Sequence, residues 1–407
     1  MTPTTLTVLV VVTALGLAVA SLSTRLRTLP LSEPLIALVT GVLVGPLVLG
    51  WLDVGALTQN AGPAHEIANV MLAISVMAIA LRYPAREAGR LWAPVTLLLV
   101  VVMPLMALTG AALGATLGIG AAAAVALGCA LCPTDPVLAS SVVTGRPAER
   151  DLPARTRRLL SLESGANDGL ALALVLVALV ALGPLSGSEA AVEIVREVAG
   201  AIVLGAVAGW AAGWAVSAGE AHGATDPAPV VVFTVVLALG VLAAAELLGV
   251  GGVLAVFVAG LALNVRSPGD DRADAVVLDE AINRFLVLPG FVLLGAALPW
   301  TQWAEQGPGL ALVVLGILAL RRLPWLLALA GPLRLRRRDA VFLGWFGPIG
   351  VSAIFYLTQL AERVPEEGTR LLAIGSAVVA ASTVVHGVSS TPGRRWYARA
   401  AQRADDT

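Results

Sequence analysis

Long apolar stretches separated by short polar segments recur along the whole chain. A helix needs roughly 20 mostly apolar residues to cross the hydrocarbon core of a membrane, and by that rule the sequence predicts about thirteen transmembrane helices. They fall at 5–22, 34–51, 66–82, 92–116, 119–143, 158–182, 192–216, 229–248, 250–265, 276–298, 308–330, 340–361 and 369–389. The connecting segments are short, so the pattern predicts one all-α polytopic membrane domain over 1–407, with a short tail at 391–407.

Two of the predicted helices contain residues that interrupt a helix. The stretch 119–143 carries Pro133 and Pro136, and the stretch 340–361 carries Gly347, Pro348 and Gly350. Proline lacks a backbone donor and clashes with the preceding turn. Paired interrupted helices near the membrane midplane are typical of secondary transporters built from inverted repeats. The sequence therefore predicts two broken helices, in the matching triplets 92–182 and 308–389.

Composition agrees with a membrane protein and limits its partners. Hydrophobic residues make up 58% of the chain, charged residues 13%, and the mean hydropathy is +0.88, far from the values of a soluble domain. A net charge of −1 leaves no basic surface for nucleic acid. The bilayer lipid is the expected surrounding partner.

The placement of basic residues predicts the orientation. All of them are Arg, and they gather after the predicted helices at 5–22, 66–82, 119–143, 250–265 and 308–330 and in the tail. Because cytoplasmic loops are enriched in basic residues, we expect the amino terminus outside, the carboxyl terminus in the cytoplasm, and the protein in the cell (plasma) membrane.

Acidic and hydroxyl side chains within apolar segments are the candidate functional residues. Ser164 and Asp168 are four residues apart and share one helix face, with Asn167 beside them. Across from them, the interrupted run at 119–143 offers Thr134 and Asp135. Ionisable residues inside a membrane usually mark an ion or proton pathway, and hydroxyl and carboxylate oxygens suit a hard cation. We expect Na⁺ at Asp168, Asp135, Ser164 and Thr134.

Burial disfavours a charged carboxylate, so Asp168 is expected to hold either a proton or a cation. Competition at one site with alternating access gives antiport. We expect Glu163 to form a structural ion pair with Arg321 or Arg322, which lie inside the predicted helix at 308–330. No cofactor is expected beyond the transported ions.

Alternatives remain open from the residues alone. Exchange of K⁺ for H⁺ could use the same site, because cavity size and rigidity set cation selectivity. A cation channel is a second alternative, and a membrane sensor or organic-anion carrier a third. An enzyme is not expected, since the sequence has no nucleophile, base and orienting group in a recognisable set.

Two motifs carry a family resemblance. TDPVLA at 134–139 and ESGANDG at 163–169 resemble the monovalent cation/proton antiporter superfamily, in its sodium/proton exchanger branch, and GVGGVLAVFVAGLAL at 249–263 is similar to another helix of that family. The resemblance implies a homodimer that serves pH homeostasis. It implies scaffold and dimerisation helices at 1–90 and 229–300, and an ion-transporting core at 91–182 and 306–390 that holds the two broken helices crossed and moves like an elevator.

The same resemblance assigns roles residue by residue. Asp168 matches the essential acid, Asn167 matches the position that marks electroneutral exchange, and Thr134, Asp135 and Ser164 match cation-site positions. Glu163 and one of Arg321 and Arg322 match the conserved ion pair. Two positions depart from the pattern: many relatives have an acidic residue where this chain reads 77–81, and an Arg in the second break, where this chain has Ile349.

Overall fold

The computed structural model describes residues 10, 13–14, 17, 31–52, 54, 61–82, 89–222, 227–266 and 287–405. Every regular element within these ranges is a helix. Five helical segments are long and apolar enough to cross a membrane, namely Gly62–Arg82, Trp92–Ala115, Ala154–Leu182, Pro308–Ala328 and Pro365–Arg403. Shorter apolar helices accompany them at Glu33–Val44, Ala121–Ala130, Phe233–Leu248 and Gly252–Val265. The predicted all-α polytopic architecture is confirmed.

The number of transmembrane helices stays a prediction. The helix expected at 5–22 and the first part of that expected at 276–298 lie largely outside the described residues. The remaining predicted ranges coincide with helical stretches to within about five residues, with two exceptions. α2 ends earlier than predicted, at Val44, and the helix predicted at 369–389 continues to Asp405 as α22.

Local sequence sets several helix ends. The Ser32 hydroxyl accepts a hydrogen bond from the Leu35 N–H at 3.4 Å and begins α2 (Glu33–Val44). α11 (Ala154–Leu182) ends at Gly183, whose φ of 96° is a left-handed conformation that favours glycine. α11 is the helix that carries the ESGANDG motif.

Both predicted interruptions are present. The first separates α8 (Ala121–Ala130) from α9 (Pro136–Val143), and the second separates α20 (Arg337–Trp345) from α21 (Val351–Arg363). Pro133 lies in the first gap, and Gly347, Pro348 and Gly350 lie in the second. Proline lacks the backbone donor that a continuous helix needs, and glycine adopts conformations that other residues avoid.

A third interruption lies where a single helix was expected. The stretch 308–330 forms α18 (Pro308–Leu320) and α19 (Leu323–Ala328), and Arg321 and Arg322 lie between them. Pro324, the second residue of α19, cannot donate to the preceding turn, which explains the break. The expectation of one continuous helix was therefore wrong here, and the break places two guanidinium groups inside the protein.

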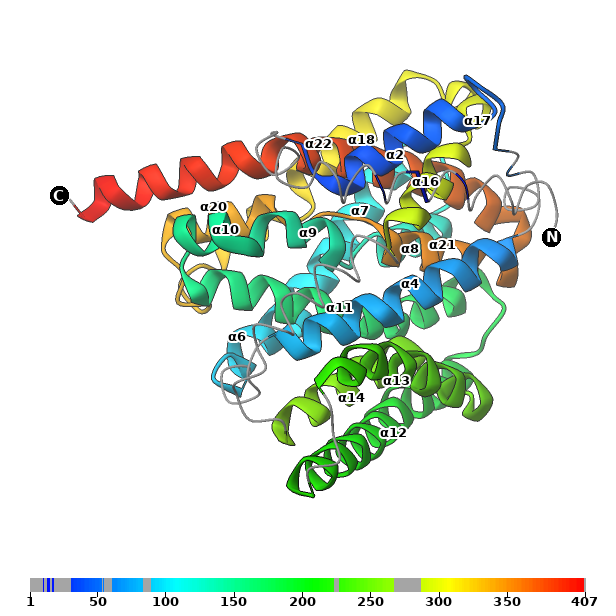
Figure 1. Cartoon of the computed structure of the whole chain (residues 1–407). Helices are drawn as coiled ribbons and strands as arrows, with labels where there is room; N and C mark the ends of the chain where they lie inside the picture. Colours follow the sequence, from blue (N-terminus) through cyan, green and yellow to red (C-terminus); the bar gives the residue numbers. More distant parts are fainter. Residues whose placement is uncertain are drawn as a thin grey trace.

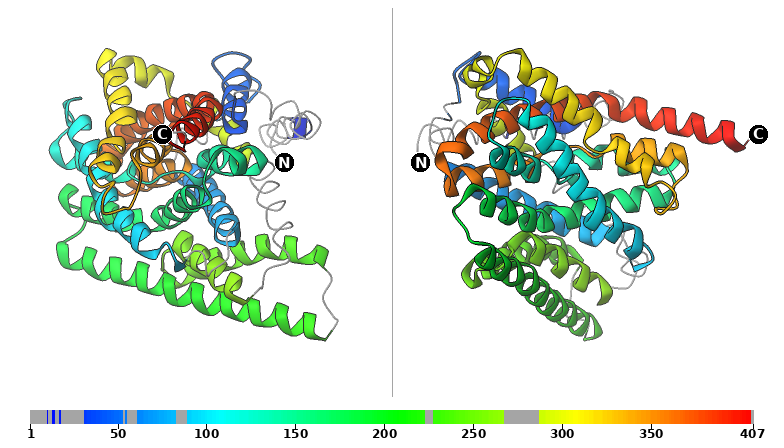
Figure 2. Two further views of the ribbon diagram at one scale, coloured as in Figure 1. Left: turned by 90° about the vertical axis from the view of Figure 1, so that its left-hand side faces the viewer. Right: turned by 180° about the vertical axis from the view of Figure 1, so that it is seen from behind.

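The helices lie in layers (Figures 1 and 2). α12 (Gly187–Ala221), α13 (Pro227–Leu248) and α14 (Gly252–Arg266) form one side of the molecule, next to α4 (Ala61–Arg82) and α11. α22 (Pro365–Asp405) lies on the opposite side and projects beyond the bundle at its carboxyl end.

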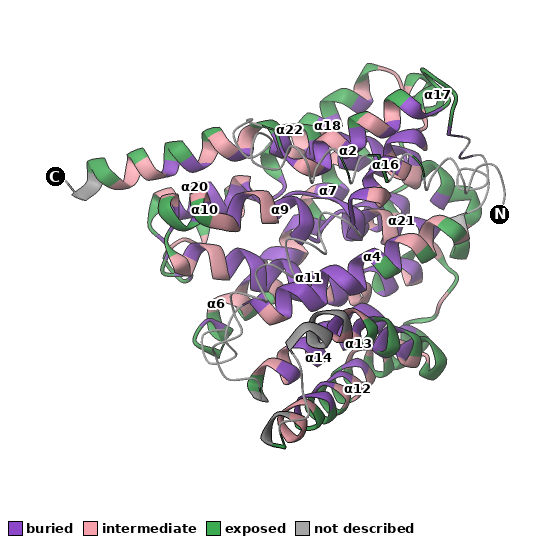
Figure 3. Ribbon diagram, in the orientation of Figure 1, coloured by how far each residue is buried: buried purple, intermediate pink, exposed green. Residues whose placement is uncertain are grey.

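Buried apolar side chains form two large clusters, and exposed residues lie on the outer faces of the helices (Figure 3). The first cluster draws mainly on α7 (Met103–Ala115), α8, α11, α18 and α20 to α22. The second draws mainly on α2, α4, α13, α14 and α16 (Leu288–Ala296). The outer face of α12 exposes apolar side chains, including Val203, Val207, Trp210 and Trp214, as a surface in contact with lipid does.

The predicted tail at 391–407 is helical as far as it is described. α22 continues to Asp405, and residues 394 and 397 contact the bundle before the helix projects beyond it. The Tyr397 hydroxyl donates to the Asp339 carboxylate on α20, and the Arg394 guanidinium donates to the Ser141 carbonyl on α9 at 2.5 Å. The end of α22 therefore contacts one half of each broken helix.

Close packing of α7 on α8 generates a stability prediction. A Cβ added at Gly128 would lie 2.6 Å from the Ala111 nitrogen and overlap the Ala107 carbonyl, so only glycine allows this approach of two backbones. We expect Gly128→Ala to destabilise the fold by about 1–3 kcal/mol, as overpacking does. Thermal unfolding in detergent measures it. Gly120→Ala, with no atom within 4 Å of the added Cβ, is the control and is expected to melt as wild type does.

Candidate functional site

The two interrupted segments lie against each other. The Asp135 N–H donates to the Pro348 carbonyl at 2.8 Å, which joins the gap between α8 and α9 to the gap between α20 and α21. Thr134 and Asp135 are fully buried at this point. The four helix ends that meet here carry backbone groups without intrahelical partners.

The Asp135 carboxylate caps two of these helix ends. One oxygen accepts from the Leu138 N–H of α9 at 2.8 Å, and the other accepts from the Val351 N–H of α21 at 2.6 Å. Both are amino-terminal ends, where the aligned peptide dipoles favour negative charge. Asp135 was expected as a cation ligand. In the structure its carboxylate caps the amino-terminal ends of α9 and α21 and so joins the two half-helices.

The Arg321 guanidinium occupies the opposite helix ends. It donates to the carbonyls of Leu131, Cys132 and Pro133 at 2.7–3.1 Å, after the last turn of α8, and to the Gly347 carbonyl at 2.5 Å, after α20. Carboxyl-terminal helix ends favour a cation. Arg321, from the break between α18 and α19, thus supplies a positive charge near the second break, where the resemblance led us to expect an Arg and this chain has Ile349.

Glu163 pairs with Arg322 and not with Arg321. Its two carboxylate oxygens lie 2.6 Å and 2.9 Å from the two terminal guanidinium nitrogens, and both side chains are at most 3% exposed. Two parallel charge-assisted hydrogen bonds of this kind are strong and fix geometry. The alternative that the sequence left open is thereby resolved.

Asn167, Thr134 and Ser164 form one hydrogen-bonded network. The Asn167 amide donates to the Thr134 hydroxyl at 2.7 Å and to Glu163 at 3.2 Å, while its oxygen accepts from the Thr134 N–H at 3.2 Å. The hydroxyls of Thr134 and Ser164 lie 2.9 Å apart. The network ties the first break to α11 and to the ion pair.

Asp168 differs from the other acidic residues of this site, Asp135 and Glu163, whose carboxylates are hydrogen-bonded. Its side chain is fully buried, and neither carboxylate oxygen has a hydrogen-bond partner among the described residues. Only its main-chain carbonyl is engaged, by the hydroxyl of Tyr356 on α21. An isolated buried charge is costly, so this carboxyl group can remain there only with a proton or a bound cation.

Ser352 and Tyr356 were not predicted from the sequence as site residues. Both are fully or almost fully buried on α21, four residues apart, and Tyr356 contacts Asp168 directly. The sequence feature that could have indicated them is the position of Ser352, which comes two residues after Gly350 and therefore at the start of the half-helix that follows the second break. The two cysteines, Cys129 and Cys132, are free and buried.

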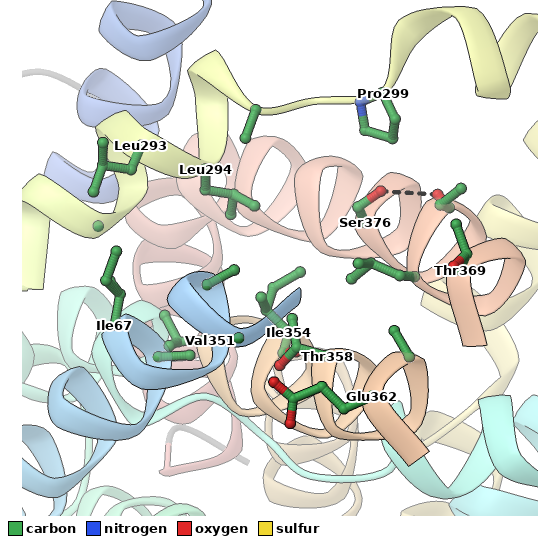
Figure 4. A pocket seen from close by; sticks show the side chains of 18 of the residues that line it. Ile67, Leu293, Leu294, Pro299, Val351, Ile354, Thr358, Glu362, Thr369 and Ser376 are labelled. Atoms are coloured by element: carbon green, nitrogen blue, oxygen red, sulfur yellow. Dashed lines mark hydrogen bonds between the residues drawn. The ribbon is translucent and has the colours of Figure 1, made fainter. Parts of the chain in front are cut away.

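A cavity of about 470 Å³ approaches the site between α4, α16, α21 and α22 (Figure 4). Its lining follows α21 from Val351, whose N–H binds Asp135, to Thr358 and Glu362. Its wall is mostly apolar, with Ser376 and Thr369 from α22 among the polar groups. The cavity therefore runs along α21 from Val351, next to the helix crossing, to the end of that helix, and Asp135 and Asp168 are not among its lining residues.

Fold and site together define a polytopic membrane protein with a buried carboxylate at two crossed, broken helices. The transmembrane sodium/hydrogen exchanger family model matches residues 10–395, and the chain belongs to that family. The Na(+)/H(+) antiporter 2 of Zygosaccharomyces rouxii is 32% identical over 360 residues, which are 84% of this chain and 44% of that protein. The Na(+)/H(+) antiporter of Saccharomyces cerevisiae is 30% identical over 343 residues, 80% of this chain and 34% of that protein. The chain thus spans less than half the length of these two relatives.

The fold is that of a solved antiporter. The sodium proton antiporter MjNhaP1 from Methanocaldococcus jannaschii at pH 8 matches with a TM-score of 0.72 and 19% identity, covering 96% of this chain and 99% of that one. A further relative, a Na(+)/H(+) antiporter of Schizosaccharomyces pombe, is 26% identical over 396 residues and is covered over 84% of its length.

The buried ion pair generates a second stability prediction. Glu163→Gln leaves the Arg322 charge buried without a counter-charge, and we expect a loss of about 3–5 kcal/mol of stability. The Glu193–Arg363 pair at 2.8 Å is the control, because its side chains are 16% and 35% exposed. Glu193→Gln is expected to cost at most about 1 kcal/mol. Equal melting temperatures for the two variants would contradict the structural role of Glu163.

Proposed function

We propose that this protein exchanges Na⁺ or Li⁺ for H⁺ across the membrane. Family membership supports this, as do the Na(+)/H(+) antiporters among its relatives. The single observation that carries the proposal is the Asp168 carboxylate, fully buried beside the helix crossing with both oxygens lacking hydrogen-bond partners in the described structure.

One proton and one cation alternate at Asp168 in this mechanism. The carboxylate is neutralised either by covalent protonation or by coordination of the cation. The two compete because a protonated carboxyl group has lost the negative charge that attracts the cation. Since one positive charge replaces another, exchange is one for one and electroneutral. Thr134, Ser164, Asn167 and Asp135 shape the site around the cation.

The proposal includes the larger arrangement of the protein. Residues 91–182 and 306–390 form a moving core, and residues 1–90 and 229–300 form a scaffold through which two copies associate. The protein lies in the plasma membrane with its amino terminus outside and its carboxyl terminus in the cytoplasm. The cavity along α21 is then the path by which the site is reached from outside.

The exchange activity is tested in proteoliposomes with an internal pH dye, with Na⁺, Li⁺ or K⁺ added outside. We expect wild type to move protons in response to Na⁺ and Li⁺, at a rate independent of an imposed membrane potential. Asp168→Asn keeps the shape of the side chain but can bind neither ion as a carboxylate does. Its flux is expected to fall to that of protein-free liposomes while the protein stays folded. Sustained flux through Asp168→Asn would contradict the mechanism.

The access path is tested by cysteine modification. Thr358→Cys in a Cys129→Ala/Cys132→Ala background places a thiol in the cavity, and Leu312→Cys places one on a surface that is 73% exposed, outside the cavity. A charged thiol reagent that cannot cross membranes, added outside to cells, is expected to inhibit exchange by Thr358→Cys at least severalfold more than by Leu312→Cys. Reaction of Thr358→Cys from the cytoplasmic side alone would show that the proposed orientation is wrong.

A further inference from the structure

Two buried groups at the helix crossing keep oxygen atoms without hydrogen-bond partners among the described residues. They are the Asp168 carboxylate and the Ser352 hydroxyl, and both side chains are 0% exposed. Buried polar groups in folded proteins are nearly always satisfied, and an unsatisfied one indicates a bound water or ion. Two such groups side by side indicate that one ligand serves both.

Contacts of the neighbouring residues fix the position of Ser352. It is the second residue of α21, directly after Val351, whose N–H donates to Asp135 at 2.6 Å. One turn further, the Tyr356 hydroxyl donates to the main-chain carbonyl of Asp168. Because residues four apart share a helix face, Ser352 lies on the face of α21 that Tyr356 turns toward Asp168.

The other oxygens of the site are already engaged. The Thr134 and Ser164 hydroxyls bond to each other, and Thr134 also accepts from Asn167. Asp135 accepts one N–H on each of its oxygens. The oxygen atoms that remain free to coordinate a cation at this crossing are therefore those of the Asp168 carboxylate and the Ser352 hydroxyl, among the described residues.

We propose that Ser352 is a ligand of the transported cation and holds it together with Asp168. This inference rests on the proposed function and adds a ligand from the second broken helix to a site otherwise drawn from the first break and α11. A hydroxyl oxygen is a hard ligand that suits Na⁺ and Li⁺. When Asp168 is protonated instead, the same hydroxyl accepts the carboxyl O–H, so it is satisfied in both states of the cycle.

The test compares variants of Ser352 by the Na⁺ concentration at half-maximal exchange (KM) and by the rise in melting temperature that Na⁺ produces in the purified protein. Ser352→Ala removes the ligand, and we expect KM to rise about tenfold, which corresponds to about 1.4 kcal/mol of binding. The stabilisation by Na⁺ should shrink accordingly. The maximal rate at saturating Na⁺ is expected to change much less.

Two further variants separate ligation from packing. Ser352→Thr keeps the hydroxyl and is expected to keep KM close to that of wild type. Ser352→Cys has nearly the volume of serine but offers soft sulfur, and is expected to behave as Ser352→Ala does. Ser390→Ala is the matched control, because Ser390 is also buried, at 4% exposure, and within the described part of the chain its hydroxyl donates to the Gly387 carbonyl of its own helix. It is expected to leave KM unchanged.

The outcomes are distinguishable. A KM and a Na⁺-induced stabilisation in Ser352→Ala equal to those of wild type and Ser390→Ala would overturn the ligand role while leaving antiport intact. An equal rise in KM for Ser352→Thr and Ser352→Cys would also overturn it, since Na⁺ affinity would then not depend on the hydroxyl. A wild-type protein without Na⁺- or Li⁺-driven proton flux would instead contradict the proposed function, and the inference with it.

Discussion

The structure depends on satisfying four helix ends inside the membrane. α8, α9, α20 and α21 all begin or end at one crossing, where no bulk water is available to hydrogen-bond their free backbone groups. Asp135 satisfies the two amino-terminal ends, and Arg321 satisfies the two carboxyl-terminal ends. Each carries the charge that opposes the local helix dipole. Without these two side chains, unwound backbone at this depth would be prohibitively costly.

Charge balance at the crossing then isolates one carboxyl group. Asp135 and Arg321 have opposite charges and oppose opposite helix ends, and Glu163 is paired directly with Arg322. Among the described residues of the crossing, Asp168 is the acid whose side chain has neither a cationic partner nor a hydrogen-bond donor. The other charges of the crossing are therefore neutralised within the protein. Asp168 alone among these groups needs a positive charge from outside, either a proton or a cation, and this is the physical basis of the proposed one-for-one exchange.

Much of this arrangement could be predicted from the sequence, because it depends on local properties. Apolar stretches of sufficient length predict the helices, Pro133, Pro136 and Pro348 predict the two breaks, and the four-residue spacing of Ser164 and Asp168 predicts a shared face. The break at Arg321 and Arg322 was not predicted, since the apolar pattern continues through it and Pro324 alone indicated that the helix is interrupted there.

Roles that depend on packing between distant segments could not be predicted. Arg321 and Arg322 are adjacent and chemically identical, and only the positions of α8, α11 and α20 decide which one meets Glu163 and which one meets the carbonyls. The contact between Tyr356 and Asp168 spans 188 residues, and that between Val351 and Asp135 spans 216. No spacing rule within one helix reveals such a register.

The central claim is that one proton and one cation compete for Asp168. Calorimetric titration of the purified protein with Na⁺, repeated in buffers with different enthalpies of ionisation, counts the protons released per Na⁺ bound. The account predicts release that approaches one proton per Na⁺ when the titration starts from the protonated protein, and neither binding nor release in Asp168→Asn. Binding of Na⁺ without proton release under those conditions, or undiminished release in Asp168→Asn, would contradict it.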